Sequence, residues 1–123
     1  IGYPLNEMLA EGQAEGSISM GQGETLYEDV MVSNGRVLNP SLADYKLPTV
    51  KDTPEMDVIH IITNEPGGPF GAKEVGEGFI VSIPGAIANA IHDATGVWIK
   101  ELPITPEKIV KALEAKEKED KRR

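Results

Sequence analysis

Residues 67–77 read Gly-Gly-Pro-Phe-Gly-Ala-Lys-Glu-Val-Gly-Glu, and an apolar pattern of helical spacing follows them. The wider stretch 64–78 holds five Gly and two Pro, which predicts a loop. The loop leads into a helix N-terminus, where main-chain N–H groups can meet an anion. A P-loop is excluded, because Ala72 precedes Lys73 and Glu74 follows it, where that motif needs Gly before the lysine and Ser or Thr after it.

Glu77 stands where this loop meets the helix, and its residue type allows two interpretations. An acid in a first turn stabilises a helix by complementing its dipole, by about 0.3–1 kcal/mol. A general base also needs a carboxylate, held in a dry cleft where its pKa is shifted. Spacing alone leaves both interpretations open.

Upstream of the loop, residues 5–29 predict a helix with interruptions, because Gly16, Gly21 and Gly23 lie inside a helical pattern. Each glycine costs roughly 1 kcal/mol relative to Ala, so we expect another backbone or a ligand to come very close. The apolar and small residues at helical spacing are Leu5, Met8, Leu9, Ala14, Ile18, Gly21 and Thr25.

Two β elements are expected between this helix and the loop. Asn34-Gly35 is a strong two-residue turn signal and predicts a hairpin over residues 31–39. Residues 58–62 are β-branched apart from His60, and they predict a strand buried on both faces.

Downstream of the loop, residues 77–94 predict a helix in two pieces, because Pro84 suits a first turn but not a helix interior. Gly96 fits the stop of this helix, and residues 97–99 predict a short strand. Thr105-Pro106-Glu107 opens a last helix with an N-cap, an N1 proline and an early acid. The order of elements predicts the α+β class, with helices packed on short strands and a β-hairpin.

We divide the 123 residues into five segments. They are a Gly-rich helical segment (1–30), a hairpin and strand (31–63), the Gly-rich loop (64–78), a helix–strand–helix unit (79–115) and a charged tail (116–123). Because the chain opens on Ile1 and not Met, we interpret it as the C-terminal portion of a longer protein.

Composition excludes several classes of function. The net charge of −8 would be repelled by a phosphate backbone, which argues against nucleic-acid binding. The chain has no Cys, so it cannot hold a Cys-ligated metal or use a thiol nucleophile, and no apolar run is long enough to span a membrane. His60 and His92 lie far apart outside any metal-binding motif, so we expect them to be structural and expect no metal ligand from this chain.

Six segments in register resemble one known family, the xanthine oxidase (molybdenum hydroxylase) family, and within it the C-terminal end of the large, molybdopterin-binding subunit. Because the match runs from about residue 12 to residue 113, it is more specific than any one motif. The segments are Gly12–Gly16, Met20–Gly23, Asp44–Thr49, Gly68–Glu77, Pro84–Ile91 and Leu102–Ile109.

The resemblance implies roles for particular residues. The glutamate of the family's Gly-Glu pair is the catalytic base, and it maps onto Glu77. The family's Gly-Gln pair lies near the pterin and maps onto Gly12 and Gln13. The loop that lines the same cofactor maps onto Lys73, Glu74, Val75 and Gly76.

The resemblance also implies cofactors and partners. The large subunit carries molybdenum–molybdopterin, either as such or as its cytosine dinucleotide, while iron–sulfur clusters and FAD lie on other domains or subunits. The partners would be the upstream remainder of the large subunit, an iron–sulfur subunit, an FAD subunit and a small-molecule substrate. The location would be cytoplasmic.

Substrate class is narrowed only by Glu74, where many members carry Gly or Ala. A Glu at this position is similar to the hydroxybenzoyl-CoA reductase branch and to aldehyde or N-heterocycle dehydrogenases. We expect an oxidoreductase that is inactive as an isolated piece and that oxidises, or reductively dehydroxylates, an aromatic, N-heterocyclic or aldehyde substrate with oxygen derived from water. The alternative is a catalytically inactive remnant that acts as an interaction module.

Overall fold

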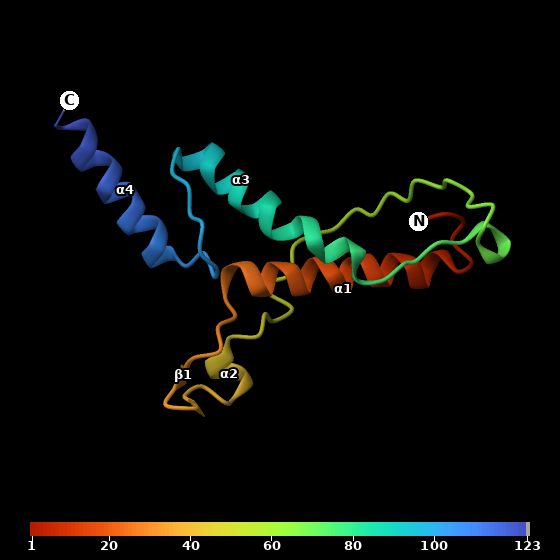
Figure 1. Ribbon diagram of the computed structural model, residues 1–123, viewed down its shortest axis with the longest axis horizontal. Helices are drawn as coiled ribbons and strands as arrows, with labels where there is room; N and C mark the ends of the chain where they lie inside the picture. The colour runs from red at the N-terminus through yellow and green to blue at the C-terminus, as the bar shows by residue number, and fades with distance from the viewer. Residues whose placement is uncertain (123) are drawn as a thin grey trace.

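The computed structural model describes residues 1–122 as a set of helices with one small hairpin (Figure 1). The α-helices are α1 (Glu7–Leu26), α2 (Leu42–Tyr45), α3 (Ile83–Thr95) and α4 (Pro106–Asp120). The strands are β1 (Val32–Ser33) and β2 (Arg36–Val37), and the 3-10 helices are η1 (Pro69–Gly71) and η2 (Glu77–Ser82). The predicted α+β class is confirmed.

Helix α1 is the centre of the fold and runs without a break, so the predicted interruptions are wrong. Asn6 caps its first turn by accepting a hydrogen bond from the Leu9 N–H at 3.0 Å. Packing against α3 and η2 offsets the low helix propensity of the glycines. A Cβ on Gly21 would lie only 2.7 Å from the Cβ of Ile83, so a glycine is needed at this crossing.

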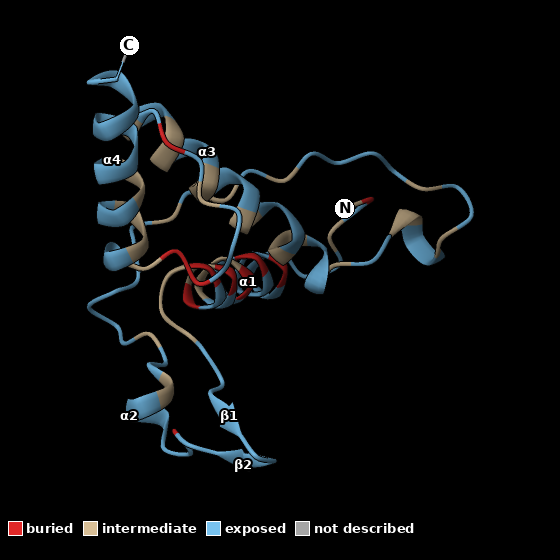
Figure 2. Cartoon of the chain, turned by 60° about the vertical axis from the view of Figure 1, so that its left-hand side comes forward, coloured by how far each residue is buried: buried red, intermediate tan, exposed pale blue. Residues whose placement is uncertain are grey.

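The buried face of α1 consists of small residues, which lets the neighbouring backbone come close (Figure 2). These residues are Ala10, Ala14, Ser17, Gly21, Gly23 and Thr25. The large apolar residues near its start point the other way: Leu5, Met8 and Leu9 are 64%, 72% and 62% exposed. The stripe that a hydrophobicity pattern would place in the core is therefore on the outside.

The predicted hairpin is confirmed and forms part of an arm that projects from the helices (Figures 1 and 2). Asn34 and Gly35 both have positive φ, 49° and 75°, as a type I′ turn requires. Buried Asn39 ties the arm together. Its Oδ1 accepts from the Met31 N–H at 2.9 Å and its Nδ2 donates to the Asp29 carbonyl at 2.6 Å.

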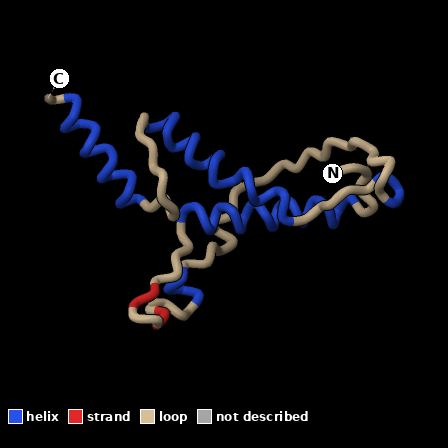
Figure 3. Tube along the Cα trace, in the orientation of Figure 1, coloured by secondary structure: helices blue, strands red, loops and turns tan. Residues whose placement is uncertain are grey.

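The two other predicted strands are absent. Residues 58–62 and 97–99 are loop in the described chain (Figure 3), because neither segment has a neighbouring strand to complete a ladder. Val97 is nevertheless buried, while Trp98 is half exposed and stacks on His92 with ring centroids 4.0 Å apart.

The helix ends near the C-terminus follow the local signals. The predicted break near Pro84 separates η2 from α3, and α3 ends at Gly96, which has a φ of 70°. Thr105 caps α4 by accepting from the Lys108 N–H at 3.4 Å. Helix α4 continues to Asp120, five residues into the segment predicted as a charged tail.

Across residues 1–122 the structure contains no helix that is both long and apolar enough to cross a bilayer.

Candidate cofactor and catalytic site

The N-terminal residues hold the Gly-rich loop beside the start of α1. Gly2 forms a β-bridge with Ala72, and the Tyr3 N–H donates to the Gly71 carbonyl at 2.7 Å. Gly2 has a φ of 65°, and a Cβ there would lie 2.5 Å from the Gly71 oxygen. Only glycine therefore allows this approach, which brings residues 72–75 next to α1.

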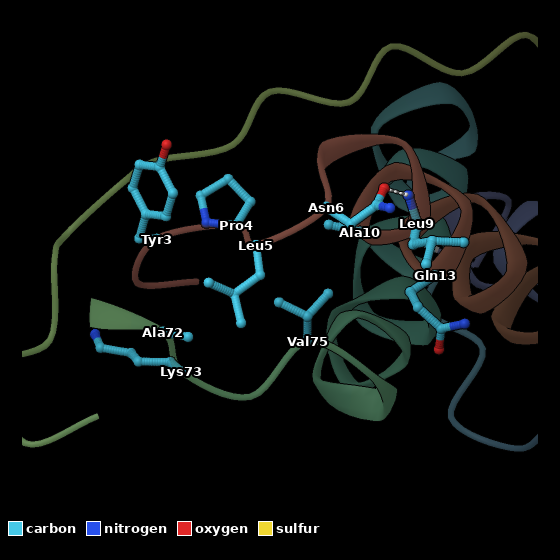
Figure 4. Close-up of a pocket in the computed structure, with 10 residues that line it drawn as sticks. All are labelled: Tyr3, Pro4, Leu5, Asn6, Leu9, Ala10, Gln13, Ala72, Lys73 and Val75. Carbon is cyan, nitrogen blue, oxygen red and sulfur yellow. Dashed lines mark hydrogen bonds between the residues drawn. The ribbon is translucent and has the colours of Figure 1, made fainter. Parts of the chain in front are cut away.

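A cavity of about 310 Å³ opens between the loop and the first turns of α1 (Figure 4). It brings together three of the predicted cofactor residues, Gln13 from α1 and Lys73 and Val75 from the loop. Gln13 and Lys73 lie at opposite ends of the view, with Leu5 and Val75 between them. The cavity is lined by Tyr3, Pro4, Leu5, Asn6, Leu9, Ala10, Gln13, Ala72, Lys73 and Val75.

Residues 3–6 and Leu9 line this cavity, although the sequence analysis assigned none of them to the cofactor site. Among them, the exposed apolar side chains of Tyr3, Leu5 and Leu9 line the cavity together with Gln13 and Lys73. Gly2 was the available signal, because a glycine just before a helix can allow a second chain segment to come close.

The second half of the loop borders another cavity, of about 300 Å³, that is lined by Ile1, Lys73, Glu74, Gly78 and Phe79. The Glu74 carboxylate lies against the main chain, since a Cβ on Gly76 would lie 2.8 Å from its Oε1. Gly76 therefore makes room for the side chain of Glu74. Lys73 lines both cavities.

Ser17 anchors the end of the loop to α1, and the sequence analysis missed it. Its hydroxyl donates to the Gly76 carbonyl at 3.3 Å, directly before Glu77. The available signal was a polar residue at helical spacing between Ala14 and Gly21, on the small-residue face of α1. The bond fixes the main chain from which the Glu77 side chain extends.

Glu77 is the first residue of η2, as the loop-to-helix pattern predicted. Its side chain does not face a concavity as expected: the residue is exposed, and it does not line either cavity that borders the loop. Residues 1–122 provide no wall opposite this carboxylate. Its role as a base stays a prediction.

Gly12 also lies outside the cavity. It is exposed on α1, and a Cβ built there would meet no atom within 4 Å. The roles assigned to Gly12, Gln13 and the four loop residues 73–76 remain predictions, although three of these six residues line one cavity.

The donor set of the cavity suits an organic cofactor better than a bare metal ion. The Gln13 amide and the Lys73 ammonium are hydrogen-bond donors that match ring heteroatoms and phosphate oxygens. Among residues 1–122 no group of three or more His, Cys, Asp or Glu side chains comes together as a metal site.

Comparisons with known proteins identify the family. A family model described as a molybdopterin cofactor-binding domain matches residues 1–54. The chain is 43% identical over 110 residues to a xanthine dehydrogenase molybdenum-binding subunit of Escherichia coli O157:H7. The alignment covers 88% of this chain and 15% of that subunit.

The chain belongs to the xanthine oxidase family of molybdenum hydroxylases. Solved members have the same fold. Quinoline 2-oxidoreductase from Pseudomonas putida 86 superimposes with a TM-score of 0.84 and 35% identity, over 92% of this chain and 15% of that one. Aldehyde oxidoreductase from Desulfovibrio gigas superimposes with a TM-score of 0.80 and 37% identity, over 89% of this chain and 12% of that one. The 123-residue chain thus spans only about 15% of the length of these relatives.

Proposed function

We propose that this chain forms one wall of the molybdenum-cofactor site in the large subunit of a molybdenum hydroxylase, with Glu77 as the general base. The observation that carries the proposal is the cavity that joins Gln13, Lys73 and Val75. Helix α1 and the loop build it from segments about 60 residues apart in sequence. Glu77 lies two residues after Val75, at the start of η2.

The molybdenum–molybdopterin group, when bound, would supply the two-electron oxidation of the substrate carbon. The Gln13 amide and the Lys73 ammonium would hold its polar edge, and Leu5 and Val75 would pack against its flat part. Lys73 also suits the phosphates of a cytosine dinucleotide form. Iron–sulfur and FAD domains or subunits would then remove the electrons.

Glu77 would accept a proton as a water-derived oxygen attacks the substrate carbon. The hydrogen bond from Ser17 to the Gly76 carbonyl would hold the main chain before it, and the rest of the large subunit would have to position the carboxylate itself. A positioned base of this kind contributes about 10²–10⁴-fold to the rate, or roughly 3–5 kcal/mol of the barrier.

The substrate we propose is an aldehyde or an aromatic or N-heterocyclic compound. Relatives are named for xanthine, for quinoline and for aldehydes, so the shared chemistry is hydroxylation of an electron-poor carbon. The resemblance at Glu74 points to the hydroxybenzoyl-CoA reductase branch, in which the direction can be reductive, or to the aldehyde and N-heterocycle dehydrogenases. We place the assembled enzyme in the cytoplasm and expect this chain by itself to be inactive.

A chimera tests the proposal. The chain replaces the matching 110 residues of the E. coli subunit, and molybdenum content and reduction by substrate are measured. An active wild-type chimera and a molybdenum-loaded but inactive Glu77→Gln variant support the function. If substrate reduces the molybdenum of a loaded Glu77→Gln chimera as fast as that of the wild-type chimera, the role of Glu77 is refuted.

The second candidate is an interaction module without catalysis, and the exposed apolar surface is the observation that favours it. A chimera that assembles but cannot hold molybdenum, even with Gln13 and Lys73 intact, would support this alternative.

A further inference from the structure

Residues 56–62, Met-Asp-Val-Ile-His-Ile-Ile, form an extended segment, and residues 56–61 have the side-chain alternation of a β-strand. Every second side chain from Met56 to His60 is partly covered by the rest of the chain. The intervening Ile59 and Ile61 are 82% and 75% exposed. Side chains that alternate with a period of two are typical of a β-strand. Two exposed isoleucines on the outer face indicate that this face is covered by a partner.

The main chain of this segment also lacks hydrogen-bond partners among the described residues. Within residues 1–122, no N–H of residues 57–62 donates a hydrogen bond. The carbonyl of Ile61 accepts one long contact, 3.4 Å, from the N-terminal ammonium of Ile1. Figures 1 and 3 show the segment as an open arch with no strand beside it. Buried main-chain groups in proteins are nearly always paired, so this row can be buried only against a partner that pairs with it.

His60 lies on the covered face of the segment, opposite Ile59 and Ile61. Its Nε2 is shielded from solvent, yet it has no hydrogen-bond partner in the described residues. The inner face of the segment is therefore covered by this chain, and the outer face with Ile59 and Ile61 is the one that lacks a cover.

The amount of surface shows how large the partner is. The chain exposes 9132 Å², whereas a compact monomer of 13.3 kDa exposes about 6,450 Å². The excess, roughly 2,700 Å², is several times the ~800 Å² that one partner buries in a standard interface. A second copy meeting this chain through an ordinary interface would leave most of it uncovered. The relatives, of which the chain spans 15%, offer a body of the required size.

We infer that residues 56–62 are an edge strand that pairs through its main chain with a β-strand of the large subunit lying outside this chain. The partner strand would present free N–H and C=O groups, and apolar side chains on the same face would cover Ile59 and Ile61. Pairing would also fix the entry to the Gly-rich loop, because Glu65 follows the segment and donates its N–H to the Gly71 carbonyl at 3.0 Å. The inference rests on the proposed function only for the identity of the partner.

Hydrogen exchange on the chimeric large subunit tests the pairing directly. Amides of residues 57–62 should exchange about 100-fold or more slower in the assembled subunit than in the 123-residue chain alone. Exchange in the assembled subunit at the rate of the chain alone would overturn the inference. Protection that appears in the chain alone and grows with its concentration would identify a second copy as the partner instead, and would also overturn it.

Two neighbouring proline variants separate strand pairing from simple apolar contact. Adjacent N–H groups of a strand point to opposite edges, so Ile59→Pro and His60→Pro remove hydrogen bonds on different sides. If the strand is paired on one side, one of the two proline variants should lose its protection from hydrogen exchange. If it is paired on both sides, both variants should lose it. Ile59→Thr is the matched control, because it keeps the N–H and the β-branch. If neither proline changes the protection, no ladder exists. Because the readout is exchange and not turnover, a failure here is distinguishable from a failure of Glu77 as the base.

Discussion

A matched pair of glycine variants on α1 tests the packing argument most sharply. Gly16 and Gly21 lie on the same helix, and each should gain roughly 1 kcal/mol of helix propensity when replaced by Ala. At Gly16 the new methyl group meets nothing within 4 Å. At Gly21 it lies 2.7 Å from the Cβ of Ile83 and 3.0 Å from both of its Cγ atoms.

The size of the difference follows from these distances. Carbon atoms pack at about 3.5–4.0 Å, so at Gly21 the helices α1 and α3 must separate by nearly 1 Å. The Cβ of Ile83 is fixed to the backbone and cannot rotate away. Overpacking of this kind costs typically about 1–3 kcal/mol. We expect Gly16→Ala to stabilise the chain by up to about 1 kcal/mol, and Gly21→Ala to be about 1–3 kcal/mol less stable than Gly16→Ala.

The measurement is urea unfolding of both variants and the parent chain, followed by helical circular dichroism at several protein concentrations. An unchanged slope with urea would show that the midpoints report stability. Equal stability of the two variants would refute the close contact between Gly21 and Ile83, and with it the reason for a small-residue face on α1.

Four other predictions concern the site, the arm and pH. In the chimera, Glu77→Gln should keep its molybdenum and lose about 10²–10⁴-fold in kcat and kcat/KM together, since Gln cannot accept a proton; retained turnover would leave Glu77 as a helix-capping acid. Lys73→Ala should lower the molybdenum content of the purified chimera more than Gln13→Ala, because it removes a charge from both cavities, and equal contents would contradict this. Asn39→Ala should cost about 1–3 kcal/mol, because it removes the buried amide that makes all three hydrogen bonds of this hub, and faster amide exchange confined to the arm would confirm it. The pKa of Asp52 is lowered first by the Thr49 hydroxyl and then by the Thr49 N–H, so this turn contributes stability above the ordinary value of 3.8 and loses it as pH falls below that value; urea unfolding at several pH values should show this loss in the parent chain and not in Asp52→Asn, and the same loss in both would contradict it.

The local signals of the sequence decided most of the secondary structure. Asn34-Gly35 specified its turn, Gly96 ended α3 and Thr105-Pro106 opened α4, because each acts through the main chain within four residues. Glu77 was likewise placed correctly at the start of a helix by the glycines before it. Such signals need no knowledge of what lies across the fold.

What the sequence could not decide depended on distant partners. The glycines of α1 looked like interruptions, but close packing at Gly21 keeps the helix whole. Residues 58–62 have the composition of a buried strand, yet a strand exists only where a second one pairs with it. For the same reason the cavity beside Lys73 could not be read from spacing, since Gln13 joins it through a contact across 60 residues. Local chemistry fixed where the elements begin and end, and tertiary contact alone decided which of their faces meet.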